Sequence, residues 1–139
     1  MIIFALTKNK KEKSMKKVIN TPKAPAAIGP YSQAIEANGT LYISGQIPIN
    51  PAVGKIEGVN ITTQTEQVFE NISAILEEAG YTFGDVVKST VYLSDIADFA
   101  GMNDVYKKYY LNECPARAAF AVKALPLGSL VEIETIAVK

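Results

Sequence analysis

The 139-residue chain has no histidine and only one cysteine, Cys114. Without histidine it has neither a Ser-His-Asp triad nor histidine-ligated zinc, and one thiol cannot build a thiolate metal site. The glycine patterns that cradle dinucleotides or nucleoside triphosphates are also missing. We therefore predict an activity without a metal or a cofactor, in which carboxylates, hydroxyls, lysines, backbone amides, water and the one arginine supply the chemistry.

The chain also lacks long apolar runs and a secretory signal. The uncharged stretch at residues 39–54 contains two prolines and is shorter than the roughly 18–20 apolar residues of a membrane helix. The apolar residues at the start precede the lysines, which is the reverse of a secretory signal, and a single cysteine is typical of a reducing compartment. We therefore predict a cytoplasmic protein with no membrane partner and no internal disulfide.

Positive charge gathers at the N-terminus. Residues 1–23 hold seven lysines and one glutamate, while the whole chain has no net charge, so the remainder is acidic. A lysine-rich arm can bind nucleic acid through its phosphates, but it is more often a solvated tail. Because the body is acidic, we expect no nucleic-acid partner. Met15 resembles a second start, so we predict that residues 1–15 are a dispensable extension and that residues 16–139 form one domain.

The first part of that domain predicts strands. Val18-Ile19 is expected to open a short strand. Asn38-Gly39 separates two alternating segments, residues 34–37 and 40–44, and this dipeptide is the strongest local signal of a hairpin turn. Residues 46–60 are rich in proline and glycine and predict a loop.

Two helices follow. Thr63, with Glu66 three residues later, fits a capping box at the start of the first helix, and Gly80 supplies its end. The second helix is predicted over residues 96–110, after a β-branched strand at 86–93. Each has an apolar stripe that is typical of packing against a core: Val68, Ile72, Ile75, Leu76 and Ala79 in the first, and Phe99, Met102, Tyr106 and Tyr109 in the second.

The chain ends with two apolar segments, residues 118–122 and 130–138, on either side of a turn at 126–129. We predict that they form a hairpin. The order of elements indicates an α+β fold with one mixed sheet and both helices packed on one face. The final strands are too apolar to face water, so we expect self-association to cover the other face.

Arg117 is the only arginine among fourteen basic residues, and it stands just before an apolar strand. A guanidinium at the entrance of a strand can hold a planar carboxylate through two parallel hydrogen bonds, which lysine cannot reproduce. The alternative is a structural ion pair with an acidic residue at a subunit contact. The residues alone leave both interpretations open.

Two glutamates are further candidates. Glu132 and Glu134 alternate along the last predicted strand, so their side chains point to one face. Two carboxylates on such a face are usually solvated. If one of them lies near Arg117, it could position or deprotonate a water.

The remaining polar candidates are weaker. Tyr31 and Ser44 lie at strand ends beside glycines, where turn chemistry explains them equally well. Asn103 in the second helix is either a surface residue or one aimed at a polar partner. Cys114 has no histidine to activate it, and we expect it to be inert.

Taken together, several segments resemble the reactive intermediate deaminase (RidA/YjgF) family. They are Ala27-Ile28-Gly29-Pro30-Tyr31-Ser32-Gln33-Ala34, Ile43-Ser44-Gly45-Gln46-Ile47-Pro48, Met102-Asn103-Asp104-Val105-Tyr106, and Pro115-Ala116-Arg117 continuing to Leu130-Val131-Glu132-Ile133-Glu134. The resemblance covers residues 16–139. One segment alone would be a weak signal, whereas all of them in the same order identify the family.

The resemblance implies a chorismate-mutase-like fold and a homotrimer with three sites in the clefts between subunits. It also implies hydrolysis of 2-imino acids or their enamine tautomers, such as 2-iminopropanoate and 2-iminobutanoate, to 2-keto acids and ammonia. On the matching positions, Arg117 would bind the substrate carboxylate and Glu132 would orient the attacking water. The other implied substrate-binding positions are Tyr31, Ser44, Gly45, Asn103 and Ala119.

One position departs from the family pattern. Many relatives have cysteine two residues after the arginine, where this chain has Ala119. A role of the backbone amide and carbonyl is preserved there, while any thiol-based regulation is lost. Two alternatives to the deaminase stay open: a non-catalytic trimer that binds a 2-keto acid through Arg117, and an RNA-directed translation inhibitor or endoribonuclease, which the lysine-rich arm favours.

Overall fold

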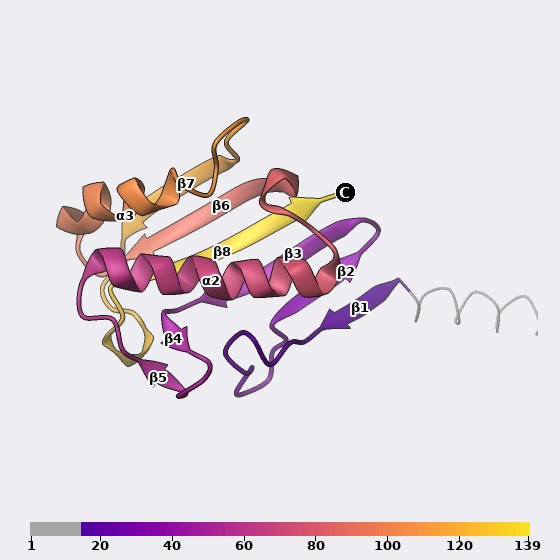
Figure 1. Ribbon diagram of the computed structural model, residues 1–139, viewed down its shortest axis with the longest axis horizontal. Coiled ribbons are helices and arrows are strands. Elements are labelled where there is room, and N and C mark those ends of the chain that lie inside the picture. Colours follow the sequence, from indigo (N-terminus) through magenta and orange to yellow (C-terminus); the bar gives the residue numbers. More distant parts are fainter. Residues whose placement is uncertain (1–14) are drawn as a thin grey trace, which may run out of the picture.

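The computed structural model describes residues 15–139, and its centre is one six-stranded sheet (Figure 1). The strands lie in the order β1-β2-β3-β8-β6-β7. All neighbours are antiparallel except β6 and β7, which run parallel. The strands are β1 (Lys16–Ile19), β2 (Ala34–Ala37), β3 (Thr40–Gln46), β6 (Val86–Leu93), β7 (Ala116–Ala121) and β8 (Val131–Val138).

Helices α2 (Ile61–Ala79) and α3 (Phe99–Tyr106) both cover one face of this sheet (Figure 1). The core lies between the helices and the strand residues that face them. Leu41 of β3, Val91 of β6 and Ile133 of β8 are fully buried there. The predicted α+β class, with a mixed sheet and both helices on one face, is therefore confirmed.

The Asn-Gly turn lies where it was predicted. β2 and β3 pair antiparallel around it, with Ala37 opposite Thr40. Asn38 and Gly39 adopt positive φ values of 51° and 76°, the conformation for which this dipeptide is favoured in two-residue hairpins. β1 then pairs with β2, so the strand predicted at Val18-Ile19 is confirmed.

The segment predicted as a loop, residues 46–60, contains a further short hairpin. β4 (Ile49–Asn50) and β5 (Lys55–Ile56) pair antiparallel. The buried side chain of Asn71 in α2 donates hydrogen bonds of 3.2 and 3.0 Å to two backbone carbonyl oxygens at the start of this hairpin. Helix α2, the next element of the chain, thus anchors a hairpin that the proline and glycine content of the segment did not indicate.

The hairpin predicted for the last two strands is wrong. β7 pairs in parallel with β6, and β8 lies on the other side of β6. This position between β3 and β6 buries Val131, Ile133 and Ala137 against the helices. Alternation along a strand indicates which side chains share a face, but it does not indicate which strand lies beside it.

Helix α2 begins one turn earlier than predicted. Its N-cap is Asn60, whose side chain accepts a hydrogen bond of 2.9 Å from the amide of Thr63. Thr63 is therefore the third helical residue and completes the capping box, in which Glu66 takes no part.

The end of helix α2 lies as predicted, because Gly80 adopts the left-handed conformation with φ 81°. Its predicted stripe faces the core, with Val68, Ile72, Ile75 and Leu76 buried and Ala79 partly buried.

The second helix is shorter than the predicted residues 96–110. A 3-10 turn covers Ile96–Asp98, and α3 follows and ends at Tyr106. Phe69 of α2 stacks on Tyr109 with ring centres 4.4 Å apart and meets Tyr106 edge-on at 5.7 Å. The aromatic stripe therefore packs in the core, as predicted.

The face of the sheet away from the helices, here called the open face, is mixed in character. Tyr42, Phe120 and Val138 are 50%, 46% and 45% exposed on it. β8 also places Glu132 and Glu134 there, so this face is less apolar than the sequence implied. That self-association covers it stays a prediction.

The predicted extension, residues 1–15, lies outside the described residues except for Met15. Most of the lysine-rich arm lies there too, so both interpretations stay predictions. Within residues 15–139, no helix has the length and apolar character needed to cross a membrane.

The start of α2 can be tested by substitution. We expect Asn60→Ala to lower the free energy of unfolding by about 1 kcal/mol, because the first helical turn loses its side-chain acceptor. Glu66→Ala, the matched control, should stay within about 0.5 kcal/mol of the parent. Urea unfolding at one fixed protein concentration measures both, and equal losses would contradict the assigned cap.

Candidate active site

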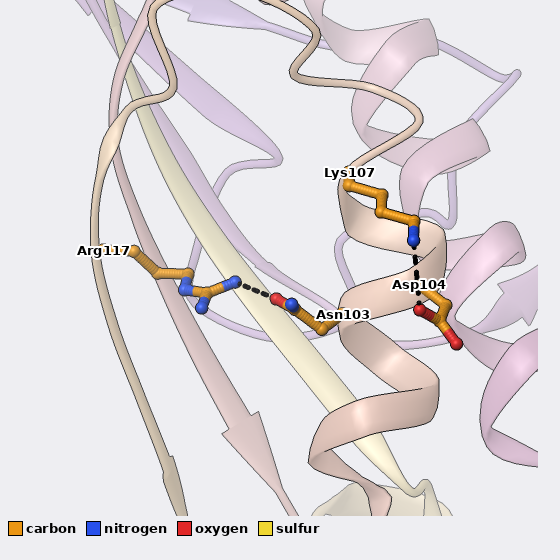
Figure 2. Close-up of polar contacts among 4 residues, drawn as sticks. All are labelled: Asn103, Asp104, Lys107 and Arg117. Atoms are coloured by element: carbon orange, nitrogen blue, oxygen red, sulfur yellow. Dashed lines mark hydrogen bonds and ion pairs between the residues drawn. The ribbon is translucent and has the colours of Figure 1, made fainter.

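Arg117 lies on β7 and points toward the helices. In the parallel register with β6 it stands beside Ser89, a buried residue on the helix-covered face. Its Nη1 donates a hydrogen bond of 2.7 Å to Oδ1 of Asn103 on α3 (Figure 2). Asn103 is thus a helical residue aimed at a polar partner, and it fixes the guanidinium of an otherwise exposed residue.

No acidic side chain neutralises this guanidinium within the described residues. The one ion pair in residues 15–139 joins Lys107 to Asp104 at 3.3 Å, on the side of α3 away from Arg117 (Figure 2). Asn103 is a neutral acceptor. Residues 15–139 therefore place no ion pair at Arg117, and the positive charge stays available to the carboxylate of a ligand.

Two aromatic rings of α3 border the guanidinium. Its Cζ lies 4.6 Å from the ring centre of Tyr106 and 5.4 Å from that of Phe99, distances typical of cation–π contacts. Burial raises the pKa of the Tyr106 phenol, while Ser89 and Arg117 oppose the rise. From the sequence, both rings are predicted only to pack in the core. The signal that could have found them is their spacing of four and three residues from Asn103, which places all three on one side of the helix.

Glu132 lies on the open face, on the opposite side of the sheet from Arg117. Along β8 it alternates with buried residues, as predicted. Its carboxylate lies against Gly45, at an irregularity in the pairing of β3 with β8. A Cβ atom at Gly45 would overlap this carboxylate, so the glycine makes room for it. Burial raises the pKa of Glu132, and the nearby charge of Glu134 raises it further.

Glu134 lies on the same face and is held by Tyr92. The Tyr92 hydroxyl donates a hydrogen bond of 2.7 Å to Oε1 of Glu134. This bond, together with burial, raises the pKa of Tyr92 to about 12. The Tyr92 ring also meets Phe120 of β7 edge-on, with ring centres 5.4 Å apart. Alternation along β8 predicts that the two glutamates share a face, but it does not indicate this tyrosine, because the contact crosses from β8 to β6.

A pocket of about 460 Å³ opens on the open face beside Glu134. Tyr31 and Ser44, both predicted site residues, form part of its wall. The Ser44 hydroxyl is fixed because it donates a hydrogen bond of 2.6 Å to the carbonyl oxygen of Ser32, whereas Tyr31 is 54% exposed. The rest of the wall consists of Lys16, Pro30, Ser32, Ile35, Tyr42 and Ile43.

The predicted site residues form two groups separated by the sheet. The arginine group lies on the helix-covered side and consists of Asn103, Arg117 and Ala119, the last of these opposite Val91. The carboxylate group lies on the open face and consists of Tyr31, Ser44, Gly45 and Glu132. The resemblance implies that Arg117 and Glu132 share a cleft between subunits. Within a single chain, the sheet keeps them apart.

Two further expectations concern metals and the thiol. Residues 15–139 contain no cluster of three or more histidine, cysteine or acidic side chains arranged to hold a metal ion. Cys114 is exposed, and its thiol lies 3.5 Å from the carbonyl oxygen of Tyr110 as a weak donor. Its inertness stays a prediction.

Comparison with known proteins relates this geometry to a family. The model of the family described as Endoribonuclease L-PSP matches residues 21–139. A RutC family protein of Pyrococcus horikoshii is 57% identical over 125 residues, which cover 90% of this chain and 99% of that protein. The 2-iminobutanoate/2-iminopropanoate deaminase of Mus musculus is 50% identical, over 90% of this chain and 93% of its own length.

Solved structures agree with this relationship. RidA from an Antarctic Psychrobacter superposes with a TM-score of 0.85 at 48% identity, over 88% of this chain and 99% of that chain. TdcF of E. coli with bound serine superposes with a TM-score of 0.85 at 40% identity, over 88% of this chain and 98% of that chain. Fold and matches define a class of small α+β proteins with one mixed sheet. Within it, this chain belongs to the reactive intermediate deaminase (RidA/YjgF) family.

Gly45 provides a direct test of where Glu132 sits. A methyl group at Gly45 overlaps the Glu132 carboxylate, so we expect Gly45→Ala to fold and to turn the glutamate into another rotamer. A crystal structure and the melting temperature of the variant measure these outcomes. Gly84→Ala is the control, because its methyl group meets only the Thr82 hydroxyl, at 3.4 Å. An unmoved Glu132 in the Gly45 variant would show that the contact is misassigned.

Proposed function

We propose that this protein hydrolyses 2-imino acids and their enamine tautomers, such as 2-iminopropanoate and 2-iminobutanoate, to 2-keto acids and ammonia. Relatives from Mus musculus and Bos taurus, 50% and 52% identical, carry the name of this deaminase. The observation that carries the proposal is the guanidinium of Arg117. A neutral amide holds it at 2.7 Å, and no acid among the described residues pairs with it.

Recognition of the substrate rests on the free edge of this guanidinium. Asn103 occupies Nη1, which leaves the remaining N–H groups of the fork for the two oxygens of a carboxylate. A hydrogen bond to a charged group contributes about 1.5–3 kcal/mol, a large share of the recognition of so small a ligand. The E. coli relative TdcF was solved with bound serine, itself a small carboxylate-bearing molecule.

The reaction needs a water and two proton transfers. Water adds across the C=N bond, and one of its protons reaches the nitrogen. The C–N bond then breaks, the remaining hydroxyl proton leaves with the nitrogen as ammonia, and the carbonyl of the keto acid remains. Glu132 is the group that accepts the first proton from the attacking water and passes it on. Because an imine carbon is already electrophilic, positioning supplies much of the acceleration.

A complete site needs both groups of residues, and one chain keeps them on opposite sides of its sheet. We infer that a neighbouring copy supplies the missing half, so that Arg117 of one subunit faces Glu132 of the next in a homotrimer. The exposed apolar side chains of the open face support this arrangement, because contact with a second copy would bury them. They include Tyr42, Phe120 and Val138.

An RNA-directed activity is the second candidate, favoured by the family description Endoribonuclease L-PSP. Phosphate contacts from the lysine-rich arm would make binding strongly dependent on salt. The full chain and a chain lacking residues 1–14 can be compared for cleavage and binding of a single-stranded RNA. Weaker binding and a shallower salt slope after the deletion would support this candidate.

Arg117→Lys tests the deaminase directly, since lysine keeps the charge but loses the planar fork. We expect it to lower kcat/KM by about 100-fold, with the oligomeric state unchanged. Keto-acid release is followed after coupling the protein to a serine or threonine dehydratase. Lys108→Arg, an exposed residue outside the site, is the conservative control.

Two outcomes of this assay would point elsewhere. If the wild-type protein releases keto acid no faster than buffer, the chain is not a deaminase of these substrates. If it nevertheless binds pyruvate, and Arg117→Lys removes that binding, the trimer is a keto-acid-binding protein instead.

Subunit mixing tests the shared cleft. Arg117→Lys and Glu132→Gln chains should each have little activity alone, because each lacks one half of every site. When equal amounts are refolded together, about a quarter of the clefts should regain both halves, since a cleft draws one residue from each neighbour. Mixing either chain with the double variant is the control and should restore nothing. A failure of the two single variants to recover activity would refute the shared cleft.

A further inference from the structure

The guanidinium of Arg117 lies over an aromatic ring that takes no part in the proposed reaction. Its Cζ is 4.6 Å from the ring centre of Tyr106, closer than the 5.4 Å to Phe99. Asn103 bonds only Nη1, and one hydrogen bond leaves a guanidinium free to turn about the axis of that bond. A flat ring against the guanidinium removes this freedom, because two planar groups stack in few orientations.

Tyr106 is itself held firmly. It is 6% exposed, and its ring lies 5.7 Å from Phe69 and 4.8 Å from Tyr110 between ring centres. Its hydroxyl lies in the core near Ser89. Burial raises the pKa of the Tyr106 and Tyr110 phenols, and Ser89 partly lowers it again. The hydroxyls of Ser89, Tyr106 and Tyr110 form no hydrogen bond, so packing is what fixes the ring.

We propose that Tyr106 is a positioning residue for Arg117. Its ring sets the plane of the guanidinium so that the edge not bonded to Asn103 faces the incoming carboxylate. Because Tyr106 follows Asn103 by three residues, a single turn of α3 presents both the hydrogen bond and the ring. A fork oriented before the ligand arrives loses less conformational freedom on binding. The effect on turnover rests on the proposed function, whereas the orientation of the fork does not.

The orientation is directly observable, because Arg117 is the only arginine in the chain. Nitrogen-15 NMR of the wild-type protein therefore shows one Nε–Hε correlation, and the ring current of Tyr106 should move Hε away from the position of a free arginine side chain. We expect Tyr106→Leu to return the signal toward that position and Tyr106→Phe to leave it unchanged. Tyr109→Leu is the control, since Tyr109 stacks on Phe69 at 4.4 Å in the same cluster.

Kinetics provide the second readout. In the dehydratase-coupled assay we expect Tyr106→Leu to raise KM about tenfold and to keep kcat within about threefold. A guanidinium with a less fixed plane binds the substrate and the transition state more weakly by the same amount. Tyr106→Phe should keep both constants. In the Arg117→Lys background, Tyr106→Leu should change KM no further, since lysine has no plane to set. A role in packing alone would act in both backgrounds.

A wild-type Hε signal at the free-arginine position would overturn the proposal, whether or not Tyr106→Leu folds. Equal increases of KM in Tyr106→Leu and Tyr109→Leu would overturn it as well. A displaced wild-type signal without any turnover would support the orientation and contradict only the deaminase activity, so the two proposals fail separately.

Discussion

A hydrogen bond of 2.7 Å between Arg117 and Asn103 joins the edge strand β7 to helix α3. The rest of the site depends on the acceptor of this bond being a neutral group. A carboxylate acceptor would fix the guanidinium equally well but would cancel its charge. The amide oxygen fixes it and leaves the charge for an anionic ligand. The bond exists because β7 lies parallel beside β6 and α3 packs through its aromatic stripe, so the core as a whole holds the arginine in place.

The sheet divides the chemistry of this chain between two sides. Neighbouring residues along a strand point to opposite faces, so the strand that buries Ile133 in the core turns Glu132 outward. Arg117 points to the helix-covered side of β7, and the two charged groups cannot meet within one chain. Under the proposed function, assembly and catalysis are therefore coupled, because a dissociated subunit has no complete site.

Much of the fold follows from short-range patterns. The turn at Asn38-Gly39 and the helix end at Gly80 lie as predicted, since each depends on a backbone conformation that few residues adopt. The errors have a common cause in long-range packing. Asn60 and Thr63 can both cap a helix, and the choice between them depends on where α2 meets the sheet. The pairing of β8 with β6 and β3 likewise depends on how the apolar face of β8 is best covered.

The site divides in the same way. By itself, the sequence singled out Arg117 and Asn103, and it assigned Glu132 and Glu134 to one face, because residue type and alternation are properties of a single segment. Only the tertiary structure brought Asn103 to Arg117, placed Tyr106 against the guanidinium and put Glu132 on the other side of the sheet. The physical reason is that a strand encodes its own two faces, whereas its neighbours, and the helix that packs across it, are selected by the close packing of the whole core.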